Sequence, residues 1–246
     1  MSRPLFVSLF LLIVLAGTAS ANDYADLIWQ QESGGGDYTA LNTNGGTAAG
    51  AYQITAGTLA SLGYVRHTGG SRGSWSNYAW TTQATSQGVS SLDGFLNSSA
   101  GHALQDQAFE TLTARNWSAL SSQTLGLAGQ TIQGVQFTEN GLLTAAHFLG
   151  AGALNDWVAS GFDPTVFPQS YLDANGFSSY DELQSYLMNR IGQASGTAFA
   201  GGPGGFGTGG TFDQTQGFPG FGAKRPILIR ETPPFQGERT TLGGTQ

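Results

Sequence analysis

One carboxylate, Glu32, has a position suited to general acid catalysis. It follows Tyr24, Leu27 and Ile28 at helical spacing, so we expect it on the apolar face of a helix predicted over residues 22–33. The C-terminal end of a helix and an apolar environment both disfavour a charged carboxylate. A glutamic acid that stays protonated near neutral pH can protonate a glycosidic oxygen. The alternative is a structural glutamate that binds nearby backbone groups.

A second element is the run Gly50-Ala51-Tyr52-Gln53, which follows a polar loop opened by Gly34-Gly35-Gly36. Small residues allow the backbone to approach a ligand closely. The ring of Tyr52 and the amide of Gln53 could bind a sugar that carries an N-acetyl group. The alternative for Tyr52 is a place in the hydrophobic core.

The third candidate, His147, lies in an apolar segment predicted to form a buried helix over residues 138–149. A histidine there is either a hydrogen-bonded core residue or part of a site. His67 and His102 show no ligand spacing with it, and the chain has no cysteine, so we expect no metal site. No phosphate-binding or dinucleotide-binding motif is present, and no cofactor is expected.

The elements that would position these residues are mainly helical. The loop at residues 37–51 is the expected place of a small β-hairpin, and residues 64–88 are expected to be irregular. The sequence therefore predicts an α+β domain of mainly helical type. Its further predicted helices cover residues 54–62, 90–96, 100–120, 153–159 and 180–191.

The N-terminus has the pattern of an export signal. Arg3 precedes an apolar run over residues 5–16, and Ala19-Ser20-Ala21 forms a small-residue cleavage site. We expect residues 1–21 to be a signal peptide cleaved near Ala21, which places the mature chain in the periplasm or outside the cell. The alternative is an uncleaved membrane anchor.

The C-terminal segment, residues 193–246, differs in composition from the rest of the chain. Glycines alternate with phenylalanines, and basic residues and prolines follow. Such a segment lacks the apolar density for a core, so we expect a disordered tail. It is either a plain low-complexity tail or a tether to a partner. The formal net charge of −7 gives the chain no electrostatic reason to bind nucleic acid.

Taken in order, three of these segments resemble motifs of one family. Glu32-Ser33 is similar to the Glu-Ser motif of the goose-type lysozyme and soluble lytic transglycosylase group. The run from Gly50 to Gln53 is similar to the following Gly-x-x-Gln element. Residues 145–150, Ala-Ala-His-Phe-Leu-Gly, lie where the family has Ala-Ala-Tyr-Asn-Ala-Gly. The resemblance covers residues 22–192.

The resemblance implies a lysozyme-like catalytic domain that cleaves the glycan strands of peptidoglycan. Glu32 would be general acid and then general base, with Ser33 and His147 orienting it. Gly50, Tyr52 and Gln53 would line the saccharide subsites. In the transglycosylase reaction the C6 hydroxyl of the sugar attacks C1, so no second carboxylate is needed.

The chain departs from the family pattern at residues 147 and 148. His147 replaces the tyrosine that orients the glutamate, and a histidine there would make the site sensitive to pH near ~6.5. Phe148 replaces an asparagine. A hydrolysing muramidase and a non-catalytic wall-binding or scaffold module are the alternatives. Domains of the family that this chain resembles often open the wall for secretion, conjugation, pilus or phage assemblies. The C-terminal tail would suit docking onto such an assembly.

Overall fold

The computed structural model describes residues 21–43 and 46–196. The predicted signal peptide, residues 1–21, lies outside this part of the chain except for its last residue. The predicted disordered tail, residues 193–246, lies outside it beyond residue 196.

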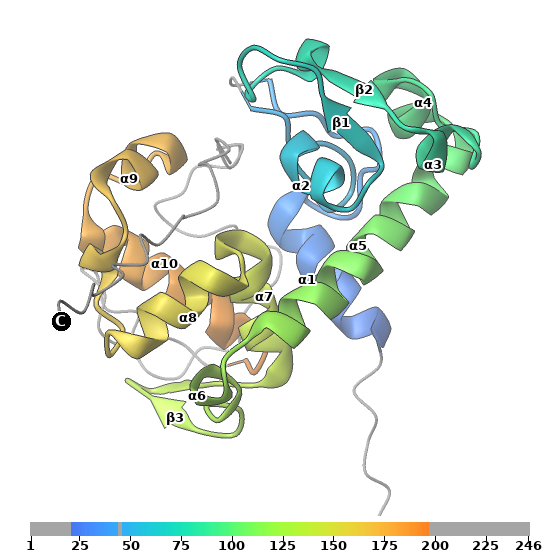
Figure 1. Cartoon of the computed structure of the whole chain (residues 1–246). Helices are drawn as coiled ribbons and strands as arrows, with labels where there is room; N and C mark the ends of the chain where they lie inside the picture. Colours follow the sequence, from blue (N-terminus) through green and yellow to red (C-terminus); the bar gives the residue numbers. More distant parts are fainter. Residues whose placement is uncertain (1–20, 44–45, 197–246) are drawn as a thin grey trace, which may run out of the picture.

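The described chain is mainly helical, as the sequence predicts, and it also contains two small antiparallel sheets (Figure 1). One sheet pairs β1 with β2, and the other pairs β3 with β4. The elements in chain order are α1 (Ala21–Glu32), α2 (Ala56–Ser61), β1 (Val65–His67), η1 (Trp75–Asn77), β2 (Tyr78–Trp80), α3 (Thr82–Thr85), α4 (Leu92–Asn97), α5 (Ser99–Ala119), α6 (Ser122–Leu125), β3 (Thr131–Ile132), β4 (Val135–Gln136), α7 (Glu139–Leu149), α8 (Ala151–Ala159), η2 (Pro164–Val166), α9 (Gln169–Asn175) and α10 (Tyr180–Gln193).

The buried side chains form two separate hydrophobic cores. The first core joins α1, α2, the β1–β2 hairpin, α4 and much of α5, and Leu59 and Phe95 are fully buried in it. The second core joins the elements from residue 120 onward, with Trp157 and Leu183 fully buried. The long helix α5 runs from one group of elements to the other, where it packs against α7 and α8 (Figure 1).

Helix α1 ends at Glu32, one residue before the predicted end, and Ser33 separates it from the three glycines. The backbone N–H groups of Ser33 and Gly35 both donate to the carbonyl of Trp29, and Gly34 has a φ of +71°. This turn stops the helix and leaves Glu32 in its last turn. Ile28, one turn earlier on the same face, is fully buried.

Helices α7 and α10 bring the second core to the end of α1. Thr138 caps α7 by accepting from the N–H of Gly141, and Ser179 caps α10 by accepting from the N–H of Glu182. The two helices approach closely at Gly141, where a Cβ atom would lie 3.0 Å from the side chain of Ile191. This close packing fixes the relative positions of the side chains that face α1.

The structure corrects the prediction for residues 64–88, which are not irregular. Strands β1 and β2 form an antiparallel hairpin in which Val65 pairs with Trp80. Its aromatic residues pack on the first core, with the rings of Trp80 and Phe95 5.4 Å apart. At residues 37–51, where a hairpin is expected, the described residues, which exclude 44 and 45, form only the isolated bridges of Ala49 to Leu41 and Ile54. Three-residue strands are too short to give a clear alternation in the sequence.

Candidate functional site

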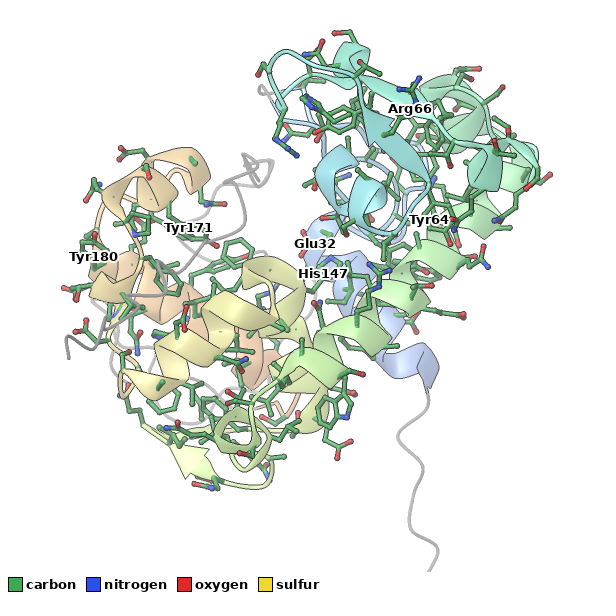
Figure 2. The ribbon with its side chains drawn as sticks, viewed as in Figure 1. Glu32, Tyr64, Arg66, His147, Tyr171 and Tyr180 are labelled. Carbon is green, nitrogen blue, oxygen red and sulfur yellow. The ribbon has the colours of Figure 1, made fainter. Side chains whose placement is uncertain are left out.

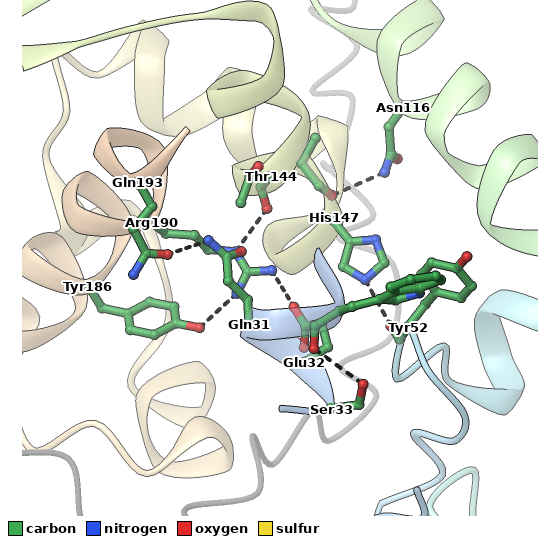
Figure 3. Close-up of polar contacts among 12 residues, drawn as sticks. Gln31, Glu32, Ser33, Tyr52, Asn116, Thr144, His147, Tyr186, Arg190 and Gln193 are labelled. Carbon is green, nitrogen blue, oxygen red and sulfur yellow. Dashed lines mark hydrogen bonds and ion pairs between the residues drawn. The ribbon is translucent and has the colours of Figure 1, made fainter. Parts of the chain in front are cut away.

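Glu32 lies at the junction of the two cores and forms an ion pair with Arg190. Its Oε1 atom accepts from Nη2 of the guanidinium, which extends from α10 (Figure 3). The side chain of Glu32 has 0% exposed surface, although the helix end itself is partly exposed. The sequence therefore predicted the inward direction of Glu32 correctly.

Arg190 is itself held by several groups. Its Nε atom donates to the carbonyl of Thr144 at 3.0 Å, and Nη1 donates to the hydroxyl of Tyr186 at 2.9 Å. The guanidinium carbon lies 5.4 Å from the ring centroid of Phe148. Burial is the largest single effect and disfavours the charged guanidinium, but the charges of and hydrogen bonds to Glu32 and Tyr186 together outweigh it, and the pKa of Arg190 is raised.

The second carboxylate oxygen of Glu32, Oε2, is buried and has no hydrogen-bond partner among the described residues. Leaving a buried acceptor unpaired costs about 1–3 kcal/mol, and more for a charged group. Unpaired buried polar atoms are uncommon, and each needs an explanation, such as a bound water, an ion or a catalytic role. Of the two oxygens, Oε1 is therefore the one held by Arg190, and Oε2 is not held by another described residue.

His147 extends from α7 to the same junction, close to Glu32 (Figures 2 and 3). Its Nε2 atom lies 3.0 Å from the carbonyl oxygen of Tyr52, and its ring packs edge-on against Phe109. Because a carbonyl only accepts, Nε2 carries the proton in this contact. The Nδ1 atom is then an acceptor, and it is buried without a partner in the described part of the chain.

The expected hydrogen bond from His147 to Glu32 is not among the contacts of the described residues. The side chain that contacts Glu32 is Arg190, from a helix 158 residues further along the chain. Burial lowers the pKa of His147, against the opposing effect of Glu32, so its titration falls below the ~6.5 that we expected from the sequence.

This lowered pKa predicts a loss of stability in acid. Below pH ~6.5 the unfolded chain binds a proton at His147 that the folded chain does not, so the free energy of unfolding falls as pH decreases through that range. We expect His147→Gln, whose amide can also donate to the Tyr52 carbonyl, to flatten this part of the curve. Urea unfolding of both proteins between pH 7 and 5 measures it. Equal slopes would contradict the prediction.

Ser33 shapes the loop after α1 and makes no contact with the Glu32 carboxylate among its hydrogen bonds. Its hydroxyl donates to the carbonyl of Trp29 at 3.2 Å. The same oxygen accepts from the N–H groups of Gly36 at 3.1 Å and Asp37 at 3.2 Å. Ser33 therefore fixes the path of the chain as it leaves the helix.

The run from Gly50 to Gln53 lies against α5. The N–H of Ala51 donates to Oε1 of Gln105 at 2.9 Å, and Nε2 of Gln53 donates to the carbonyl of Gly50 at 2.9 Å. Tyr52 is a core residue with 3% exposure, and its ring stacks on Phe109 at 4.1 Å. Tyr52 thus takes the alternative that the sequence left open, and only its carbonyl reaches the site, through His147.

Gly50 has a strict steric requirement for glycine. Its φ is +78°, and a Cβ atom would lie 2.0 Å from Oε1 of the buried Gln105. We expect Gly50→Ala to lower the free energy of unfolding by about 2–5 kcal/mol, from the left-handed backbone and the overpacking together. Urea unfolding tests this. Gly152→Ala, in α8 with no atom within 4 Å of the new Cβ, is the matched control and should not be destabilised.

Sequence reasoning missed Arg190 and Tyr186. A signal was present, because Arg190 lies beside the apolar positions Leu183, Leu187 and Ile191, which share one face of α10 and are all fully buried. A buried arginine requires an anionic partner. An arginine on an apolar stripe, together with a glutamate on another, would have suggested their pairing.

The chain matches no protein-family model, no curated protein and no solved structure.

Within residues 21–43 and 46–196, no group of three or more histidine, cysteine, aspartate or glutamate side chains is arranged to hold a metal ion. The described helices also include none long and apolar enough to cross a membrane.

Proposed function

We propose that the protein is an exported enzyme that cleaves the glycan strands of peptidoglycan, as a lytic transglycosylase with a lysozyme-like domain over residues 22–192. The observation that carries the proposal is the asymmetric environment of Glu32. One carboxylate oxygen is held by Arg190, while Oε2 is buried with no partner among the described residues. The resemblance of three ordered motifs to this family supports the same conclusion.

The reaction needs one carboxyl group that changes role. The ion pair with Arg190 contains the carboxylate form of Glu32, so the reaction requires Oε2 to bind a proton before the substrate reacts. Oε2 donates this proton to the oxygen of the β-1,4 bond between N-acetylmuramic acid and N-acetylglucosamine, and the bond from C1 to that oxygen breaks. The C6 hydroxyl of the muramoyl sugar then attacks C1 and gives its proton to Oε2. The product is a 1,6-anhydro end, and Glu32 returns to its starting form.

Arg190 is placed to stabilise Glu32 between the two proton transfers of this reaction. After the first proton transfer Glu32 is a carboxylate, while positive charge develops on the sugar ring. The guanidinium stabilises that carboxylate through its contact with Oε1. In a site closed to solvent such an interaction is stronger than in water.

Of the other residues that the resemblance implies, Ser33, Gly50 and Gln53 act through the backbone they position. Ser33 and Gln53 bind loop carbonyls and N–H groups, and Gly50 allows the chain to pack on Gln105. The Tyr52 ring lies in the core with 3% exposure, so the proposal assigns it no sugar contact.

Residues 1–21 would direct export, and residues 193–246 would serve as a tether to an envelope-spanning assembly. Both segments lie outside the described residues, except for residues 21 and 193–196.

The test is a digest of purified peptidoglycan with the full chain lacking residues 1–21, analysed by mass spectrometry. We expect soluble fragments that end in 1,6-anhydro sugars. Fragments with reducing ends would identify a hydrolysing muramidase instead. The absence of soluble fragments would overturn the enzymatic proposal.

One observation favours a second candidate, a non-catalytic wall-binding module. The Glu32 side chain has 0% exposed surface and joins two cores through an ion pair, which suits a structural role. This candidate predicts that the protein sediments with insoluble peptidoglycan without releasing fragments. The same digest, with a pelleting step, separates the two.

A further inference from the structure

We propose that Arg190 is the positioning residue for Glu32, fixing Oε1 so that Oε2 alone exchanges protons with the substrate. The inference rests on the proposed function and assigns different tasks to the two oxygens of one carboxylate. Neither His147 nor Ser33 contacts the carboxylate in the hydrogen bonds of the described residues, so Arg190 takes the orienting role that the resemblance gave to them.

The form of the ion pair carries this inference. Arginine commonly binds a carboxylate with two parallel N–H donors, one to each oxygen, which is the stronger arrangement. Here the contact runs from Nη2 to Oε1 alone, and Oε2 stays buried without a partner in the described chain. A pair formed only for stability would satisfy both oxygens, because an unpaired buried acceptor is unfavourable.

Two further N–H groups of the guanidinium are engaged, and these contacts restrict how the group can turn toward Oε2. Nε donates to the carbonyl of Thr144, and Nη1 donates to the hydroxyl of Tyr186. The ring of Phe148 lies beside the guanidinium carbon, at 5.4 Å from centroid to carbon. These contacts fix the plane of the group at three points.

The supporting residues are arranged in pairs one helical turn apart. Thr144 and Phe148 lie on α7, and Tyr186 and Arg190 lie on α10. Helix positions separated by four residues share one face. Two packed helices of the second core therefore hold the cation that orients a carboxylate of the first core.

Two conservative variants test the positioning role. We expect Arg190→Lys, which keeps the charge but loses the planar fork, to lower kcat for glycan release by about 10–100-fold, since small misplacements of a catalytic group have effects of this size. Tyr186→Phe removes only the Nη1 partner and should lower kcat by a smaller factor. KM should remain within about twofold of wild type in both, because substrate binding is unchanged.

Arg115→Lys is the matched control. Arg115 lies on α5 in the exposed class, and its Nη1 donates to the carbonyl of Ser61 at 2.7 Å, away from Glu32. Its kcat and KM should equal those of wild type. In a Glu32→Gln background, Arg190→Lys should cause no further loss, because Arg190 acts only through Glu32.

The outcomes distinguish this inference from the function on which it rests. If Arg190→Lys and Tyr186→Phe keep the wild-type kcat while Glu32→Gln is inactive, Arg190 does not position Glu32 and the proposed function stands. A rise in KM with unchanged kcat would likewise overturn the positioning role. If the wild-type protein itself releases no glycan, both proposals fall. Tyr186→Phe keeps the test decisive if Arg190→Lys does not fold.

Discussion

Glu32→Gln is expected to lower the rate of fragment release from peptidoglycan by about 10²–10⁴-fold, the usual contribution of a general acid–base group. The amide has nearly the same shape as the carboxyl group but neither donates nor accepts a proton in the reaction. Its carbonyl oxygen can still accept from Nη2 of Arg190, so the contact between the two cores is retained. The initial rate of soluble fragment formation measures the effect.

The control for this variant is Glu110→Gln, an exposed glutamate on α5. It makes the same chemical change away from the junction, so its rate should match that of wild type. Circular dichroism and the urea midpoint of Glu32→Gln establish that the variant is folded. A folded Glu32→Gln protein that releases fragments at the wild-type rate would remove Glu32 from the mechanism.

The longer helices could be predicted from the sequence because their apolar residues recur with a clear period. The segments predicted at residues 22–33, 138–149 and 180–191 correspond to α1, α7 and α10 with ends that differ by two residues or fewer. Glycines and capping side chains mark several of these ends, as at Gly34 and Thr138. The short strands β1 and β2 gave no such period, so the hairpin was missed.

The site was predictable only where local spacing decides the direction of a side chain. The spacing of Ile28 and Glu32 on one helix predicted an inward carboxylate, and its side chain is fully buried. The pairing of Glu32 with Arg190 depends on how the two cores pack against each other. No local sequence pattern predicts that packing. His147 was correctly expected in a buried helix, but its partner, the carbonyl of Tyr52, also depends on the packing of the cores.

Arg190→Met should lower the free energy of unfolding by about 3–5 kcal/mol, the usual effect of removing one partner from a buried ion pair. Glu32 would remain in a site with 0% side-chain exposure and no cation, and the Thr144 carbonyl and the Tyr186 hydroxyl would each lose a donor. Urea unfolding at pH 7 measures the change. Arg66→Met is the control, because Arg66 is exposed on β1 and its replacement should change stability by less than about 0.5 kcal/mol.

The double variant Glu32→Leu/Arg190→Met separates the stability of the pair from its role in chemistry. Replacing both charges by apolar side chains of similar size removes the uncompensated charge, so the double variant should be more stable than Arg190→Met alone. It would nevertheless be inactive, because no carboxyl group remains at the junction. If the loss of unfolding free energy in the double variant equals the sum of the losses in Glu32→Leu and Arg190→Met, the two charges do not interact. A stable and inactive double variant would indicate that the pair is kept for the reaction of Glu32, since apolar residues can hold the two cores together.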